Sequence, residues 1–413
     1  MQYGLLGKTL KHSYSPQLHA LMGDPTYRLF EMPREDVADF LRSGAFDGIN
    51  VTIPYKETVL PLLDEVSPEA QAIGSVNTVV RRNGRLLGDN TDHYGFSALL
   101  RRAGIAVKDR KCLILGSGGS ARTVRAVLSA AGAAAIVTIS RSGEDNYQNI
   151  ARHHDAQLIV NTTPVGMFPE NAAAPLSLDG FDALEAVADI IYNPARTALL
   201  QDAEARGLRC SDGLPMLVYQ AKRAREIFDG TSLPDELAER ILAQLRRQMR
   251  SITLVGMPGS GKTTVGGLLA QQLGRPLLDT DDVFARVNGA TAEAVINERG
   301  ESAFRDAESA VIAQVCSQSS SIIATGGGAV LRAQNRGLIR SNSYVVYLQR
   351  DLESLCTDGR PLSAGGIDAL KALHQTRDPL YRAVSDLIVD NNGDPDQTVK
   401  TILKELGYED TGH

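Results

Sequence analysis

The stretch GMPGSGKTT, from Gly256 to Thr264, decides the predicted fold of the last part of this 413-residue chain. It fits the spacing G-x-x-x-x-G-K-[ST], follows the apolar run SITLV (251–255), and precedes apolar residues at helical spacing (265–273). A strand, a glycine loop and a helix in this order form a phosphate-binding loop, because backbone N–H groups at a helix N-terminus attract an anion. We therefore expect ATP and Mg²⁺ as ligands.

The residues of this loop have separate expected roles. Lys262 is expected to reach the β- and γ-phosphates, and the hydroxyl of Thr263 to bind Mg²⁺. A glycine turn that fits the pattern without binding a ligand is the alternative interpretation, and the flanking strand and helix argue against it. The expected nucleotide contacts are Gly256, Gly259, Ser260, Gly261, Lys262, Thr263 and Thr264.

The composition is that of an ordinary globular protein, with 43% hydrophobic and 22% charged residues. The net charge of -6 argues against nonspecific nucleic-acid binding, which needs a basic surface. No apolar run approaches the ~20 residues of a membrane-spanning helix, and the start lacks a signal-peptide pattern. The four cysteines, Cys112, Cys210, Cys316 and Cys356, are far apart, which indicates free thiols. We therefore expect a cytoplasmic protein without nucleic-acid or membrane partners.

Short β-rich runs alternate with helical runs along the whole chain, which predicts the α/β class. We expect an α/β substrate-binding domain (1–95 with 213–248), a Rossmann-type dinucleotide-binding domain (96–212) and a phosphate-loop domain with a parallel sheet (251–413). Asn83-Gly84 predicts a two-residue hairpin turn. Apolar residues at helical spacing in 237–245 predict an amphipathic helix, not a flexible linker, before the last domain.

A second glycine pattern, GSGGSA, occupies residues 116–121 between an apolar strand and a helical run, and fits G-x-G-x-x-[GA]. The next predicted strand ends in Ser140-Arg141, and an arginine there suits the 2′-phosphate of NADP(H) better than the 2′-hydroxyl of NAD. Glu144 and Asp145 reduce the local positive charge, and a solvated arginine beside an ordinary turn is the alternative. The expected cofactor contacts are Gly116, Gly118, Gly119, Ser120, Ala121, Ser140 and Arg141.

The motifs that follow the phosphate loop resemble shikimate kinase over residues 250–413: LLDTDD, SAFRDAE, ATGGGAV, GRPLSAGG and TRDPLYR. Taken singly, each motif has an ordinary structural interpretation. An acidic pair often caps a helix, a single arginine is often solvated at the surface, and a glycine triplet often makes a turn. The resemblance implies that Asp279 helps to bind Mg²⁺, that Asp281 accepts the substrate's hydroxyl proton, and that Arg360 belongs to a lid over the γ-phosphate. SLCTDG stands before Arg360, where the family usually has basic residues. The implied shikimate-binding residues are Arg305, Gly326, Gly327, Gly328 and Arg377.

The first 245 residues resemble shikimate dehydrogenase through HSYSP, NVTIPYKE, SVNT, GDNTD, DIIYNP and DGLPMLVYQA. The resemblance implies that Lys56 and Asp92 form the catalytic pair, and a reduced ketone does need a proton donor. Alone, Lys56 would be interpreted as a solvated lysine and Asp92 as a helix cap. The resemblance also implies a cofactor contact at Gly213. The implied substrate-binding residues are Ser13, Ser15, Thr52, Asn77, Tyr192 and Gln220.

The two resemblances together predict a bifunctional enzyme. Its first half would reduce 3-dehydroshikimate with NADPH, and its second half would phosphorylate the resulting shikimate with ATP. Two alternatives remain: an NAD-dependent quinate/shikimate dehydrogenase fused to a kinase, and a non-catalytic metabolite-sensing regulator derived from such enzymes. The sequence leaves the oligomeric state open.

Overall fold

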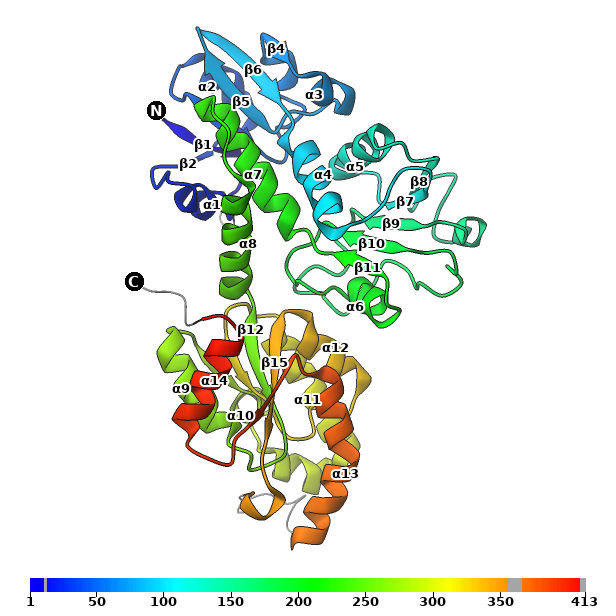
Figure 1. Cartoon of the computed structure of the whole chain (residues 1–413), viewed down its shortest axis with the longest axis vertical. Helices are drawn as coiled ribbons and strands as arrows, with labels where there is room; N and C mark the ends of the chain where they lie inside the picture. The colour runs from blue at the N-terminus through cyan, green and yellow to red at the C-terminus, as the bar shows by residue number, and fades with distance from the viewer. Residues whose placement is uncertain (11–12, 356–365, 409–413) are drawn as a thin grey trace. The chain divides into compact units, whose positions relative to one another are not determined.

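The computed structural model describes residues 1–10, 13–355 and 366–408. Its elements form three β-sheets (Figure 1), and its contacts divide it into two compact units. The first unit comprises Met1–Val165, Ala174–Tyr192 and Asp202–Gln244, and the second comprises Gly166–Ala173, Asn193–Gln201 and the chain from Leu245 onward. The α/β class is confirmed, whereas the division into three domains with the stated boundaries stays a prediction.

The first sheet has six strands in the order β2-β1-β3-β5-β6-β4. Strands β1, β2 and β3 are parallel, and β5 is antiparallel to β3 and β6. Asn83 and Gly84 have φ angles of 52° and 78°, so the β5–β6 hairpin closes with the predicted Asn-Gly turn. The strands are β1 (Tyr3–Gly7), β2 (Arg28–Glu31), β3 (Gly48–Val51), β4 (Glu65–Val66), β5 (Thr78–Arg82) and β6 (Arg85–Asp89).

Side chains that alternate along β1 place a core on each face of this sheet. Leu6 packs in a cluster with Val37 and Leu41 of α2, whereas Leu5 packs in a cluster with Phe228 of α7. Successive side chains of a strand point to opposite faces of the sheet, so a strand with helices on both faces is buried on both sides. The helices of this part are α1 (Ser15–Leu21), α2 (Val37–Arg42), α3 (Pro68–Ile73), α4 (Thr91–Ala103) and α7 (Leu214–Asp229).

The second sheet has five strands in the order β11-β10-β9-β7-β8, and every pair is parallel. Cys112 and Ile114 of β7 share a buried cluster with Phe96 of α4 and Val124 of α5. The strands are β7 (Lys111–Leu115), β8 (Ala135–Ile139), β9 (Leu158–Asn161), β10 (Ala186–Asp189) and β11 (Arg209–Ser211). The helices that follow in this part of the chain are α5 (Gly119–Ala130), α6 (Ala198–Ala205) and α8 (Asp235–Met249).

The third sheet, in the second unit, is also parallel, with the order β13-β14-β12-β15-β16. Helices α9 and α14 pack on the face that carries Leu254, and α11 and α13 pack on the face that carries Val255 (Figure 1). The strands are β12 (Ser251–Val255), β13 (Leu277–Asp279), β14 (Ile322–Ala324), β15 (Ser343–Gln349) and β16 (Leu387–Asp390). The helices are α9 (Lys262–Leu273), α10 (Thr280–Asn288), α11 (Ala292–Cys316), α12 (Ala333–Ser341), α13 (Gly366–Val384) and α14 (Pro395–Glu405).

The predicted helix after residue 262 ends where glycine permits a left-handed residue, since Gly274 has a φ of 62°. The predicted amphipathic helix over 237–245 is part of α8. In the described ranges no helix is both long and apolar enough to span a bilayer. In each parallel sheet the loops after the strands carry the candidate site residues, at the edge where open α/β sheets bind ligands.

Candidate active sites

A cavity of about 500 Å³ in the first unit brings together the residues expected to bind and reduce a substrate. It lies beside the carboxyl ends of β1 and β3 and the start of α7. Every substrate-binding and catalytic residue predicted for the first half of the chain lines it: Ser13, Ser15, Thr52, Lys56, Asn77, Asp92, Tyr192 and Gln220, together with Gly213.

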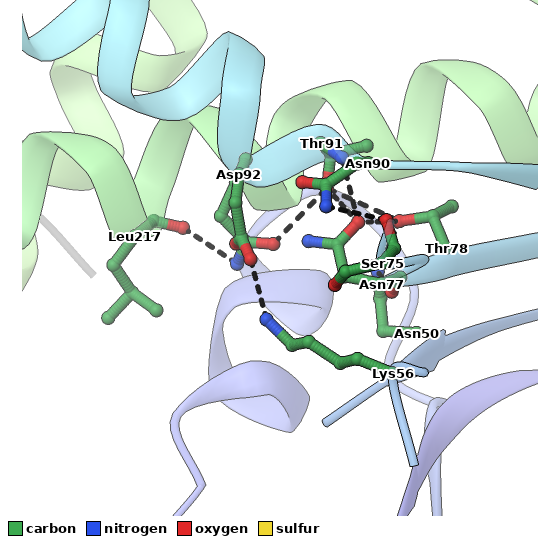
Figure 2. Close-up of polar contacts among 10 residues, drawn as sticks. Asn50, Lys56, Ser75, Asn77, Thr78, Asn90, Thr91, Asp92 and Leu217 are labelled. Carbon is green, nitrogen blue, oxygen red and sulfur yellow. Dashed lines mark hydrogen bonds and ion pairs between the residues drawn. The ribbon is translucent and has the colours of Figure 1, made fainter. Parts of the chain in front are cut away.

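Lys56 and Asp92 form an ion pair at this cavity (Figure 2), with 2.5 Å between Nζ and Oδ2. Their side chains are 29% and 18% exposed, so the pair is partly desolvated and still reachable from the cavity. Asn90 takes the N-cap position of α4, which places Asp92 inside the first helical turn. The interpretation of Asp92 as the helix cap is therefore wrong, and its carboxylate is available to Lys56.

Polar groups of three segments surround the pair. Asn77 Oδ1 accepts hydrogen bonds from the backbone N–H of Thr91 (2.7 Å) and from the Thr78 hydroxyl (3.0 Å). Ser13 Oγ accepts from the backbone N–H of Ser15 at 3.2 Å, which holds the two hydroxyls near the start of α1. The cavity therefore offers several neutral donors and acceptors and one ammonium–carboxylate pair.

Two aromatic side chains also line the cavity. The rings of Tyr14 and Tyr192 meet edge to face with 5.9 Å between centroids, and burial raises the pKa of both phenols. A Cβ on Gly213 would lie 2.0 Å from the carbonyl oxygen of Ile190, so glycine is needed for the start of α7 to approach the residue that follows β10. Gly213 and Tyr192 both line the cavity, and the close contact between Gly213 and Ile190 excludes any larger residue at position 213.

The glycine loop 116–121 connects β7 to α5, as predicted. Gly116 has a φ of 102°, Gly118 is the N-cap residue of α5, and the helix begins at Gly119. Because β8 pairs with β7 in parallel, Ser140 and Arg141 follow at the same edge of the sheet. The cofactor roles of Gly116, Gly118, Gly119, Ser120, Ala121, Ser140 and Arg141 stay predictions.

The acidic neighbours of Arg141 include one carboxylate that is bound elsewhere. Asp145 Oδ1 lies 2.8 Å from His153 Nε2. The Asp145 carboxylate therefore has a partner other than Arg141.

A second cavity, of about 670 Å³, lies in the second unit above the carboxyl ends of β12, β13 and β14. Its lining holds the expected phosphate-loop, metal and acceptor-binding groups on one surface. The predicted residues that line it are Gly259, Gly261, Lys262, Thr263, Thr264, Asp279, Asp281, Arg305, Gly326, Gly327, Gly328 and Arg377.

The phosphate loop has the backbone that its glycines allow. Gly256, Gly259 and Gly261 have φ angles of 149°, 83° and 89°. Lys262 Nζ donates to the carbonyl oxygens of Gly256 (3.0 Å) and Met257 (2.8 Å), so its ammonium lies over the loop. Gly256 and Ser260 belong to the loop without lining the cavity.

Asn391 stabilises this loop and was missed by sequence reasoning. Its Nδ2 donates to the carbonyl oxygen of Ser260 at 2.7 Å, and its Oδ1 accepts from the Thr398 hydroxyl at 2.7 Å. The only sequence signal was its place directly after an apolar strand, at the ligand-binding edge of the sheet.

Thr263 and Asp279 meet at the position expected for a cation. The Thr263 hydroxyl donates to Asp279 Oδ2 at 2.7 Å, and Asp279 Oδ1 accepts from the backbone N–H of Asp281. Asp279 therefore caps α10 as well as facing Thr263. Within the ranges that the structure describes, no group of three His, Cys, Asp or Glu side chains forms a ready metal site.

The glycine triplet is required by close packing against other site residues. A Cβ on Gly326 would lie 3.1 Å from Asp281 Oδ1, and one on Gly327 would lie 2.7 Å from Pro258. At Gly328 the same atom would lie 2.2 Å from Arg305 Nη1. The triplet is thus more than a turn, because side chains there would displace the acid and the arginine.

Arg305 is a buried guanidinium held by two carboxylates. Its Nη1 donates to Glu308 at 2.7 Å and its Nη2 to Glu301 at 3.1 Å. Burial raises the pKa of Glu308, although the adjacent Arg305 lowers it. Arg377 is also buried and faces the same cavity. Glu308 was missed by sequence reasoning, and its position three residues after Arg305 on one helix was the available signal.

The lid prediction concerns residues outside those described. Arg360 was expected to belong to a lid over the γ-phosphate, and that expectation stays a prediction. In the first unit, sequence reasoning also missed Asn50, Tyr14, Met216 and Leu217, which line the substrate cavity.

Comparisons with known proteins separate the chain into the same two parts. The family model for the shikimate dehydrogenase substrate binding domain matches residues 5–79, and the model for shikimate kinase matches residues 258–407. A shikimate dehydrogenase (NADP(+)) of Clostridium perfringens is 35% identical over 265 residues, spanning 59% of this chain and 98% of that protein.

Two solved structures resemble the first part. A chorismate mutase/shikimate 5-dehydrogenase fusion protein from Clostridium acetobutylicum superposes with a TM-score of 0.56 at 34% identity, over 59% of this chain and 96% of that one. A shikimate 5-dehydrogenase from Thermus thermophilus, solved with NADP(H) and shikimate, gives a TM-score of 0.53 at 34% identity, over 59% and 99%.

Proposed function

This chain belongs to the shikimate dehydrogenase family and carries a shikimate kinase domain, and on that premise we propose how its two cavities act in succession. It is a bifunctional enzyme of the shikimate pathway, with an NADP-dependent dehydrogenase and an ATP-dependent kinase. The first cavity reduces 3-dehydroshikimate to shikimate, and the second phosphorylates shikimate to shikimate 3-phosphate. The observation that carries this assignment is that, among the described residues, the expected reactive groups of each half line a single cavity of their own unit.

In the dehydrogenase, Lys56 transfers the proton and Asp92 positions Lys56. NADPH supplies the hydride that the ketone carbon takes up. Lys56 holds a proton beside the carbonyl oxygen and donates it as the negative charge develops there. Asp92, with Oδ2 at 2.5 Å from Nζ, fixes the ammonium at the cavity. In the reverse direction the same pair removes the proton from the hydroxyl.

The remaining polar groups orient the ring. The Ser13 and Ser15 hydroxyls donate to the substrate carboxylate, and Thr52, Asn77 and Gln220 bind ring hydroxyls. Tyr192 completes the wall beside Gly213, which contacts the cofactor in this proposal. Such fixed donors lower the barrier mainly by orientation, because they hold the carbonyl against Lys56.

The cofactor is placed by the glycine loop and selected by Arg141. The loop ends at the N-terminus of a twelve-residue helix, where backbone N–H groups suit a pyrophosphate. Arg141 binds the 2′-phosphate through a charge-assisted hydrogen bond. The NAD-dependent alternative predicts a preference for NAD(H) over NADP(H), which a titration with each cofactor would show.

In the kinase, the chain positions the acceptor and the phosphates. MgATP supplies the phosphoryl group, and Thr263 and Asp279 offer the oxygen ligands that Mg²⁺ prefers. Lys262 neutralises the terminal phosphates, and Asp281 accepts the proton of the acceptor hydroxyl. Arg305 and Arg377 bind the carboxylate, for which paired guanidinium groups have the right geometry. The lid role of Arg360 is part of this proposal.

A coupled assay tests the assignment. Purified protein is given 3-dehydroshikimate, NADPH, ATP and Mg²⁺, and the products are separated by chromatography. We expect shikimate to form first and shikimate 3-phosphate to follow. Omission of ATP should stop the sequence at shikimate, and omission of NADPH should leave the starting compound unchanged. Absence of either product from folded protein would contradict the corresponding half.

A further inference from the structure

A chain of buried hydrogen bonds leads from the start of β2 to the substrate cavity. The Tyr27 hydroxyl donates to Asn50 Oδ1 at 2.8 Å, and Asn50 Nδ2 donates to Thr78 Oγ1 at 3.1 Å. The Thr78 hydroxyl donates in turn to Asn77 Oδ1 at 3.0 Å. Figure 2 shows the inner part of this chain, from Asn50 through Thr78 to Asn77.

The backbone groups that each amide faces fix its orientation, because each of these groups can only donate or only accept a hydrogen bond. Asn77 Oδ1 faces the backbone N–H of Thr91 at 2.7 Å, and a backbone N–H can only donate. The Asn50 amide faces the backbone carbonyl of Asn77 at 3.4 Å, which can only accept, so its nitrogen lies on that side. Asn50 Oδ1 is therefore left for Tyr27, whose hydroxyl has to be the donor.

Burial makes these directions hard to reverse. Tyr27, Asn50, Asn77 and Thr78 are all buried, with 7% exposure or less. Rotating the Asn50 amide would place its oxygen against the carbonyl of Asn77 and would remove the acceptor from Tyr27. Buried polar groups without partners are costly, so the four side chains hold one joint arrangement.

The first member of the chain is itself held firmly. The Tyr27 ring stacks on His19 with 3.9 Å between centroids and 10° between planes. Burial raises the pKa of Tyr27 well above its ordinary value, so the phenol keeps the proton that it donates. Tyr27 lies in a buried cluster with Tyr3 and Phe228 and does not itself line the cavity.

We propose that Tyr27 and Thr78 are positioning residues for the dehydrogenase, acting through Asn50 on Asn77. They keep the Asn77 oxygen turned toward its internal donors, so that the amide nitrogen is presented to the cavity as a donor to a substrate hydroxyl. Neither residue touches the substrate, because neither lines the cavity. This inference rests on the proposed reduction of 3-dehydroshikimate at that cavity.

The test removes one hydroxyl at a time and measures shikimate oxidation with NADP. Tyr27→Phe keeps the ring on His19, and Thr78→Val keeps the shape of the side chain. Each should raise the KM for shikimate about threefold to tenfold, the effect of one misdirected hydrogen bond. The kcat should change less than twofold, and the KM for NADP should not change. Thr78→Ser, which keeps the hydroxyl, should restore the KM.

The double variant gives a sharper readout. Tyr27→Phe with Thr78→Val should raise KM little more than either change alone, since both act on the same arrangement. If the rise in KM of the double variant equalled the product of the two single rises, the residues would act separately. That result would contradict a connected chain of hydrogen bonds.

Tyr3→Phe is the matched control. Tyr3 is a buried tyrosine of the same cluster, and its hydroxyl donates to Asp229 Oδ1 at 3.0 Å instead of to the chain. It should lower stability in urea by an amount similar to Tyr27→Phe and leave the KM unchanged. An equal rise in KM in this control, or an unchanged KM in Tyr27→Phe, would overturn the positioning role. Loss of shikimate oxidation in the unmodified protein would instead refute the proposed function.

Discussion

Gly328→Ala tests the packing of the kinase cavity with a single added methyl group. The new Cβ would lie 2.2 Å from Arg305 Nη1, and ordinary contact begins near 3.4 Å, so the guanidinium has to move by about 1.2 Å (3.4 minus 2.2). The backbone at Gly328 is outside the positive-φ region, so the substitution adds no backbone strain. Because the displaced guanidinium is buried and paired with Glu301 and Glu308, we expect a stability loss of about 1–3 kcal/mol.

The substitution should also impair catalysis. A guanidinium displaced by this distance loses a charge-assisted hydrogen bond to the shikimate carboxylate, worth about 1.5–3 kcal/mol. This corresponds to roughly a tenfold to hundredfold fall in kcat/KM for shikimate. The KM for ATP and the dehydrogenase activity should not change, since the phosphate loop and the first cavity are untouched.

The assay measures ADP formation against shikimate concentration, with Gly267→Ala as the control. Gly267 lies in α9, and an added Cβ meets nothing within 4 Å. This helical substitution should leave kcat/KM unchanged and add up to about 1 kcal/mol of stability. If Gly328→Ala kept kcat/KM within threefold of the unmodified protein, Arg305 would not be the carboxylate ligand that the cavity implies.

Three further predictions concern charged residues. Asp92→Asn should lower the kcat of shikimate oxidation by roughly tenfold or more, through loss of a charge-assisted contact to Lys56, while ADP formation from shikimate stays normal; normal oxidation would remove Asp92 from the pair. Arg141→Ala should raise the KM for NADPH roughly tenfold to hundredfold and the KM for NADH little; equal losses would show that Arg141 does not bind the 2′-phosphate. Burial raises the pKa of Glu308, so the folded state disfavours its charge, and its contribution to stability is present at acid pH and lost as pH rises through the raised pKa. Urea unfolding over a pH series tests this. The free energy of unfolding of the unmodified protein minus that of Glu308→Gln should fall as pH rises, and a rise in this difference would contradict the raised pKa.

Features set by local backbone chemistry could be predicted from the sequence. The phosphate loop and the Asn83-Gly84 turn depend on glycine or asparagine at positive φ, and the structure has both. The strand before and the helix after each glycine loop were likewise predictable, since apolar periodicity determines them. Lys56 and Asp92 are 36 residues apart, and only the family resemblance connected them before the structure did.

Other features depend on tertiary contacts that no local pattern encodes. The need for glycine at Gly328 comes from the guanidinium of Arg305, and the need at Gly213 comes from the Ile190 carbonyl. The hydrogen bond between Tyr27 and Asn50 joins residues that are distant in the sequence, so no local pattern predicts it. The buried polar contacts around the sites were therefore the part that sequence reasoning missed.

Complementation between two inactivated proteins tests most directly that one chain carries two separate sites for consecutive reactions. Lys56→Ala and Lys262→Ala are each supplied with 3-dehydroshikimate, NADPH, ATP and Mg²⁺, and the products are resolved. Lys56→Ala should leave 3-dehydroshikimate unchanged, and Lys262→Ala should stop at shikimate. A mixture of the two should form shikimate 3-phosphate, because each protein supplies the site that the other lacks. Failure of the folded mixture to form it, or its formation from 3-dehydroshikimate by either variant alone, would contradict the account.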